Sequence, residues 1–193
     1  MIETPHEFHK RIAPRSVALL DYALKFATQA HEGQVRKYSG EPYIAHPMNV
    51  ARIVAEVTCD VNMICAAYLH DTVEDTDVTL DEIATSGFGG DVARLVEMLT
   101  DVSVPADGNR KRRKAIDRHH TGQASKQGKT IKLADLLDNT CSITRDDPNF
   151  AKVYMAEKSL LLTELRGGDQ FLWDMARMTV AIHEDSLLQE ALA

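Results

Sequence analysis

Residues 61–77 read VNMICAAYLHDTVEDTD, and this stretch decides how the rest of the sequence is interpreted. Its apolar residues recur at three- and four-residue spacing, which predicts a helix with Asp60 as its N-terminal cap. The apolar helix runs directly into His70 and then into an acidic cluster. Like charges one turn apart destabilise a helix by on the order of 0.2–0.5 kcal/mol per pair, so a cation against the cluster explains it more readily. A solvent-exposed acidic helix end with an incidental histidine is the alternative.

Helical spacing extends outward from this stretch in both directions. Thr79 and Glu82 have the spacing of a capping box, and Ser16 is placed to cap the first helix. No segment alternates with period two for long enough to predict a strand. Further helices are predicted between Ser16 and Gly33 and over residues 50–57, 92–99, 130–144, 149–165 and 170–188. The sequence therefore predicts an all-α fold in a single domain spanning residues 1–193.

The composition is that of a soluble globular protein, with 44% hydrophobic and 26% charged residues. No run approaches the roughly 18 apolar residues of a membrane span. Residues 1–6 lack the basic and apolar regions of a secretory signal. The cysteines (Cys59, Cys65 and Cys141) show no CxxC spacing. They predict reduced, mostly buried thiols in a cytoplasmic protein.

The net charge of −7, from 22 basic and 29 acidic residues, argues against nucleic acid as a partner. The charge is uneven, however. Residues 110–118 contain six basic residues and one acidic residue, Asp117. This segment is either a solvated helix face or a surface that attracts a small polyanion, and charge alone leaves both interpretations open.

A second unusual carboxylate is Asp135, within the sequence KLADLLDN at residues 132–139. Its apolar neighbours predict partial burial, and a buried carboxylate is unfavourable unless it is paired or bound to a metal. Asn139 lies one helical turn later and projects in the same direction. A salt bridge to Lys132 or Arg145 explains Asp135 as well as a metal does.

The segment GQVRKYSGEPYIAHP at residues 33–47 is a loop in which Arg36 and Lys37 can approach a phosphorylated ligand. His46 begins the helix after it, whereas His31 closes the helix before it and is expected to pair locally. Imidazole nitrogens combined with carboxylate oxygens suit manganese, iron or zinc. Together the separate segments supply a four-ligand set of His46, His70, Asp71 and Asp135.

Three strings, at residues 36–47, 69–76 and 132–139, resemble the three signatures of the RelA/SpoT-type HD hydrolases in the same order. Phe88-Gly89 after the acidic run matches as well, and the resemblance covers roughly residues 16–165. It implies an HD-superfamily helical domain that binds one divalent ion, usually manganese. The ligands it implies are His46, His70, Asp71 and Asp135.

The resemblance also implies roles for other residues. Glu74 and Asp75 would position or activate the attacking water, and Asn139 and Arg36 would complete the catalytic site. Lys37 and Ser39 in the loop, and Tyr154 further along, correspond to substrate contacts. The substrates of that family are the alarmones guanosine tetra- and pentaphosphate, from which the enzymes remove the 3′-pyrophosphate to give GDP or GTP.

Fewer than 30 residues follow the matched region, too few for the synthetase domain of bifunctional members, so the chain resembles the small, hydrolase-only branch. Departures from the family pattern at Tyr38, Leu136 and Asp138 concern substrate recognition. Another nucleotide, such as an adenosine 3′-pyrophosphate analogue or NADPH, is therefore the alternative substrate. A nucleotide sensor without catalysis is a third hypothesis, and a homo-oligomer stays open.

Overall fold

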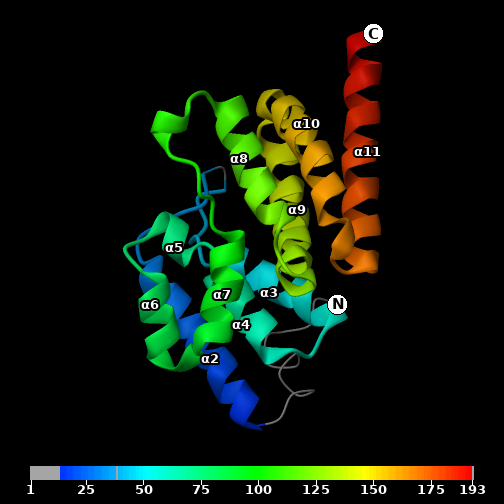
Figure 1. Cartoon of the computed structure of the whole chain (residues 1–193). Coiled ribbons are helices and arrows are strands. Elements are labelled where there is room, and N and C mark those ends of the chain that lie inside the picture. The colour runs from blue at the N-terminus through cyan, green and yellow to red at the C-terminus, as the bar shows by residue number, and fades with distance from the viewer. Residues whose placement is uncertain (1–13, 38, 193) are drawn as a thin grey trace. The chain divides into compact units, whose positions relative to one another are not determined.

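The computed structural model describes residues 14–37 and 39–192, and most of them are helical (Figure 1). Within these ranges the one extended pairing is an isolated antiparallel bridge between Val35 and Pro42. The predicted all-α class is confirmed. In chain order the elements are α2 (Pro14–Ala30), α3 (Ala45–Val57), α4 (Val61–Leu69), α5 (Thr72–Asp75), α6 (Leu80–Ile83), η2 (Ala84–Phe88), α7 (Gly90–Leu99), η3 (Pro105–Asp107), α8 (Arg110–Gly122), α9 (Lys126–Asp146), α10 (Pro148–Glu164), η4 (Leu165–Gly167) and α11 (Gln170–Leu192).

The chain divides into two compact units. As far as the chain is described, the first comprises residues 14–36 and 41–100, and the second comprises residues 37, 39–40 and 101–192. Each unit packs its own set of helices. The single domain expected over residues 1–193 stays a prediction.

Helix α4 is the core of the first unit, where it packs against α2, α3 and α7. Every residue from Met63 to Leu69 is buried. The carboxylate of Asp60 accepts hydrogen bonds from the backbone N–H groups of Asn62 and Met63, which confirms the predicted cap. Because the helix is apolar to its last residue, the next residue, His70, also lies in the interior.

Two other predicted helix starts have different outcomes. The Thr79 hydroxyl accepts the backbone N–H of Glu82, so Thr79 caps α6 as expected. Ser16 was expected to cap the first helix, but it lies inside α2, which already includes Pro14. Proline suits the first turn of a helix because its φ is preset and its missing N–H needs no partner there.

In the second unit, α9 packs against α8, α10, α11 and η4. It begins four residues earlier than predicted because the Ser125 hydroxyl caps it, accepting the N–H of Gly128. Its buried face contains Leu133, Ala134 and Leu136. This packing fixes the backbone that carries Asp135.

All three cysteines are free thiols, as expected for residues without pairing partners. Only Cys65, on α4, is buried, so the prediction of mostly buried thiols is wrong. Cys59 lies in the connection before α4, and Cys141 lies on the exposed side of α9. None of the described helices is long and apolar enough to cross a membrane. Residues 1–6, which were read as lacking a secretory signal, lie outside the described residues.

Gly168 connects η4 to α11 at a point where the second unit is closely packed, and a substitution there tests that packing. A Cβ there would lie 2.8 Å from Cδ1 of Leu133 and 3.2 Å from the backbone of Lys129. Overpacking against a backbone cannot be relieved by a rotamer change, so Gly168→Ala should lower the free energy of unfolding by about 1–3 kcal/mol in denaturant titrations. Gly167→Ala is the matched control, because its Cβ would meet only the Lys129 side chain, at 3.6 Å. Equal effects of the two substitutions would contradict this account.

Candidate active site

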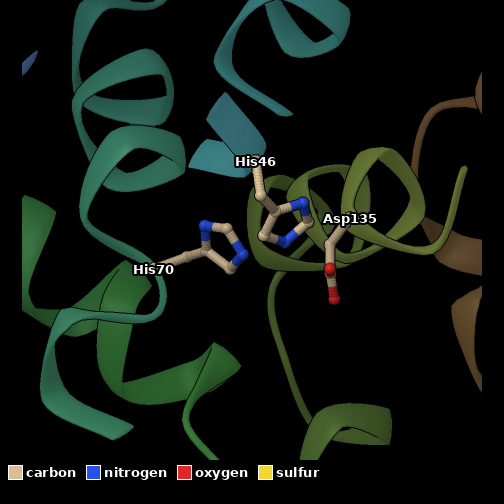
Figure 2. A group of neighbouring side chains, drawn as sticks. All are labelled: His46, His70 and Asp135. Carbon is tan, nitrogen blue, oxygen red and sulfur yellow. The ribbon is translucent and has the colours of Figure 1, made fainter. Parts of the chain in front are cut away.

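Two buried histidines approach each other in the first unit. His46 comes from the first turn of α3 and His70 directly follows α4, and their exposed fractions are 1% and 2%. The rings point toward one another, with centroids 5.1 Å apart (Figure 2). Both Nε2 atoms face the same carboxylate oxygen, Oδ2 of Asp71, at 3.4 Å from His46 and 3.1 Å from His70. The sequence therefore predicted three residues that the fold brings together.

The tautomer of His70 follows from its other ring nitrogen. Nδ1 lies 2.8 Å from the backbone carbonyl oxygen of Ala67. Since a carbonyl only accepts hydrogen bonds, Nδ1 carries the proton and donates it. In a neutral ring this leaves the lone pair on Nε2, the atom that faces Asp71. Metal-binding histidines are commonly oriented by such a hydrogen bond from the second nitrogen.

The spacing of these donor atoms fits a divalent ion. Two ligand atoms that are each about 2.1 Å from an ion, at right angles to one another, lie about 3 Å apart. The separations of 3.1 and 3.4 Å to Asp71 are close to this value. Two imidazoles with a carboxylate suit manganese, iron or zinc, as the sequence predicted. His46, His70 and Asp71 are thus residues that can hold a metal.

Tyr43 is a site residue to which sequence analysis assigned no role. Its hydroxyl donates a 2.7 Å hydrogen bond to Oδ2 of Asp71. Burial, reinforced by the negative charges of Asp71 and Asp75, raises the pKa of Tyr43 well above its usual value. The phenol therefore stays protonated and remains a donor. Its ring lies 4.8 Å from that of His31, which helps to hold it in place.

The acids after Asp71 lie on the next helical turn. Glu74 and Asp75 belong to α5 and reach solvent. Partial loss of hydration, together with the negative charge of Asp71, raises the pKa of Asp75. Gln34 donates to the backbone oxygen of Asp75 at 2.8 Å and pairs with Nδ1 of His31 at 2.9 Å. His31 thus pairs locally, as predicted, and supports the acidic turn.

Arg36 is half-buried where the loop closes in the first unit. Its backbone N–H donates to the carbonyl oxygen of Glu41 at 2.8 Å, next to the bridge between Val35 and Pro42. In the loop between Val35 and Pro42, the side chains of Lys37 and Ser39 are exposed. Tyr38, the departure from the family pattern in this loop, lies outside the described residues.

In the second unit, α9 carries Asp135, which Figure 2 also labels, with only 5% of its surface exposed. Lys132 Nζ lies 2.9 Å from its Oδ2, so the predicted salt bridge to Lys132 exists, while Arg145 pairs with Asp146 instead. Asn139 donates to Oδ1 at 2.6 Å, in line with the expected projection of its side chain. Both carboxylate oxygens of Asp135 are therefore held by neighbouring side chains of the same helix.

The second unit also brings together two of the predicted substrate residues. Lys37 Nζ lies 6.0 Å from the centroid of the Phe150 ring, and Tyr154 lies 6.2 Å from the same ring. Arg110 covers Phe150 at 5.2 Å and makes a bidentate ion pair with Glu157. Sequence analysis did not single out Phe150, because a lone aromatic residue at a helix start gives no functional signal.

Comparison with known proteins shows the family to which the chain belongs. The model of the HD domain matches residues 23–149, which is well over half of the chain. The chain belongs to the HD domain family. His46, His70 and Asp71, which meet in the first unit, all lie within the matched residues.

Relatives within the HD domain family carry specific names. Guanosine-3′,5′-bis(diphosphate) 3′-pyrophosphohydrolase MESH1 of Danio rerio is 43% identical over 137 residues, covering 69% of this chain and 73% of the relative. MESH1 of Homo sapiens is 45% identical over 130 residues, covering 65% and 70%. A solved structure described as a metazoan ortholog of SpoT that hydrolyzes ppGpp matches with a TM-score of 0.75 and 29% identity, covering 84% of this chain and 93% of that one.

The hydrogen bond from Tyr43 to Asp71 can be tested in this HD domain. Removing a residue that orients a metal ligand typically weakens metal affinity about 10- to 100-fold, so Tyr43→Phe should do so in calorimetric titrations with Mn²⁺. Tyr22→Phe is the control, since Tyr22 is 42% exposed and its ring stacks on Phe88. Unchanged affinity of Tyr43→Phe would show that Asp71 is positioned without the phenol.

Proposed function

We propose that the chain is a metal-dependent guanosine tetra- and pentaphosphate 3′-pyrophosphohydrolase that releases pyrophosphate and leaves GDP or GTP. The observation that carries the proposal is the convergence of His46 and His70 on Asp71. The names of the relatives that share this HD domain support the choice of substrate. A nucleotide polyphosphate also agrees with the net charge of −7, which disfavours nucleic acid. The predicted cytoplasmic location agrees with the free thiols.

The proposed ligand set adds Asp135 to His46, His70 and Asp71, with Mn²⁺ as the ion. Support comes from Asp135, a carboxylate that is almost fully buried and lies beside the ammonium group of Lys132. Support also comes from the Nε2 lone pair of His70, which its bond to Ala67 leaves available. When bound, a divalent ion lowers the pKa of water and offsets the charge that develops on phosphoryl oxygens.

The remaining residues of the site act through proton transfer and charge. Glu74 accepts the proton of the attacking water, and Asp75 orients that water from the same helical turn. Arg36 stabilises the negative charge that builds on the phosphoryl group. Asn139 keeps Asp135 in position through its hydrogen bond to Oδ1. Lys37, Ser39 and Tyr154 are proposed to contact the nucleotide.

The reaction is tested first with metal-stripped protein and guanosine tetraphosphate, analysed by anion-exchange chromatography. Added Mn²⁺ should produce GDP and pyrophosphate, whereas the metal-free protein should give neither. Asp71→Ala should abolish turnover while the helical circular dichroism is kept, because Asp71 is a ligand rather than a core residue. Asp81→Ala, an exposed acid on α6, should leave the rate unchanged.

The same assay separates the alternatives. Faster release of pyrophosphate from the adenosine counterpart would reassign the base preference, and activity on NADPH would extend the substrate range. No product from any of these nucleotides, with metal shown to be bound, would favour another HD nucleotidase. Tight nucleotide binding without any product would identify a sensor.

The role of Glu74 is tested by replacing its carboxylate with the amide of glutamine. Glu74→Gln keeps the shape of the side chain but cannot accept a proton, so kcat should fall about 10²- to 10⁴-fold. Mn²⁺ affinity should be unchanged, because Glu74 is not among the proposed ligands. Glu82→Gln, which changes an exposed acid in the first turn of α6, is the control. A loss of kcat below threefold would remove Glu74 from the mechanism.

A further inference from the structure

Three helices of the second unit each direct one lysine into the same region. Lys114 of α8 forms an ion pair with Asp101 and lies 3.7 Å from Asp117. Lys132 of α9 pairs with Asp135 at 2.9 Å. Lys158 of α10 interacts electrostatically with both of these lysines and with Asp101 and Asp135. The three lysines and the carboxylates of Asp101 and Asp135 therefore lie within electrostatic range of one another.

Lys158 differs from the other two lysines. Among residues 14–37 and 39–192, no carboxylate lies within ion-pair distance of its ammonium group. Its Nζ lies instead over the ring of Tyr154, 4.8 Å from the ring centroid. Burial, and after it the positive charge of Lys132, lowers the pKa of Lys158 to about 8. At neutral pH the group is still mostly protonated. A positive charge is thus held where no carboxylate pairs with it.

The charge balance of this cluster changes if Asp135 is a metal ligand. Its negative charge is then shared with the ion, and Lys132 loses part of its partner. The three ammonium groups would then face Asp101, which pairs with Lys114, and Asp117, whose carboxylate also accepts hydrogen bonds from the backbone N–H groups of Val102 and Ser103 and from the Ser103 hydroxyl. An added anion restores the balance, and a compact group with several negative oxygens can contact more than one ammonium.

We propose that Lys158, with Lys114 and Lys132 beside it, forms a binding site for the pyrophosphate group. The assignment of pyrophosphate rests on the proposed function, whereas the anion site itself rests on the lysine cluster. Tyr154 supports this placement, because the residue under Lys158 is one of the predicted substrate contacts. Lys158 is therefore a specificity residue for the leaving group, which sequence analysis did not identify.

The probe is inorganic pyrophosphate, titrated calorimetrically into the manganese-loaded protein with matched free metal in both solutions. Lys158→Met keeps the length and the apolar stem of the side chain but removes the charge, and should weaken binding at least tenfold. Lys158→Arg, which restores a cation, should bind within about threefold of wild type. Lys152→Met is the control, because Lys152 is an exposed lysine of the same helix; it should bind as wild type does.

Differential acylation of the unmutated protein gives an independent measurement, should Lys158→Met fail to fold. Pyrophosphate should protect Lys158, but not Lys152, from an amine-specific reagent, as read by peptide mass spectrometry. Absence of pyrophosphate binding to wild type, or lack of protection at Lys158, would overturn the inference even if guanosine tetraphosphate is hydrolysed. Lys158-dependent pyrophosphate binding without any hydrolysis would instead overturn the proposed function and leave the anion site standing.

Discussion

The convergence of two imidazole nitrogens on Oδ2 of Asp71 is the interaction on which the candidate site in the first unit depends. Both rings are almost completely buried, and buried polar groups are unfavourable unless each has a partner. The fold supplies hydrogen-bond partners for some of these atoms. The carbonyl of Ala67 accepts from His70, and the phenol of Tyr43 donates to Asp71. The apolar helix α4 is the rigid support that makes these short distances reproducible.

A break in the helical path makes it possible for consecutive residues to act together. On a continuous helix, His70 and Asp71 would diverge by about 100°. Here α4 ends at Leu69, and Asp71, with φ of −96° and ψ of −6°, precedes the short helix α5. The turn between the helices directs both side chains to one place. It also sends Glu74 and Asp75 onto the following turn, on the same side as Asp71. One local change of direction thus produces the whole acidic part of the site.

Features that depend on a few neighbouring residues were predictable from the sequence, and features that depend on distant contacts were not. The caps at Asp60 and Thr79 follow from side chains that bond to the next turn. The bond from Tyr43 to Asp71 spans 28 residues, and nothing in the local pattern of Tyr43 indicates it. The approach of Lys158 to Lys114 and Lys132 depends on how α10 packs against α8 and α9, which the local sequence does not indicate. For Asp135, sequence reasoning left a salt bridge and a metal as alternatives, and the ion pair with Lys132 is compatible with both.

Behind the net charge of −7, acidic and basic groups are unevenly distributed between the two units, and this matters for a polyanionic substrate. The first unit contributes the acidic turn and the imidazoles, which by themselves would repel a nucleotide polyphosphate. A divalent ion beside Asp71 would offset part of the negative charge of that region and so reduce its repulsion of a polyanion. The second unit needs no such offset, since Lys158 already holds a positive charge without a carboxylate partner among the described residues. Under the proposed function, a nucleotide bearing pyrophosphate is attracted when the ion is bound and Lys158 is charged. Metal loading therefore controls the binding of the substrate as well as its chemistry.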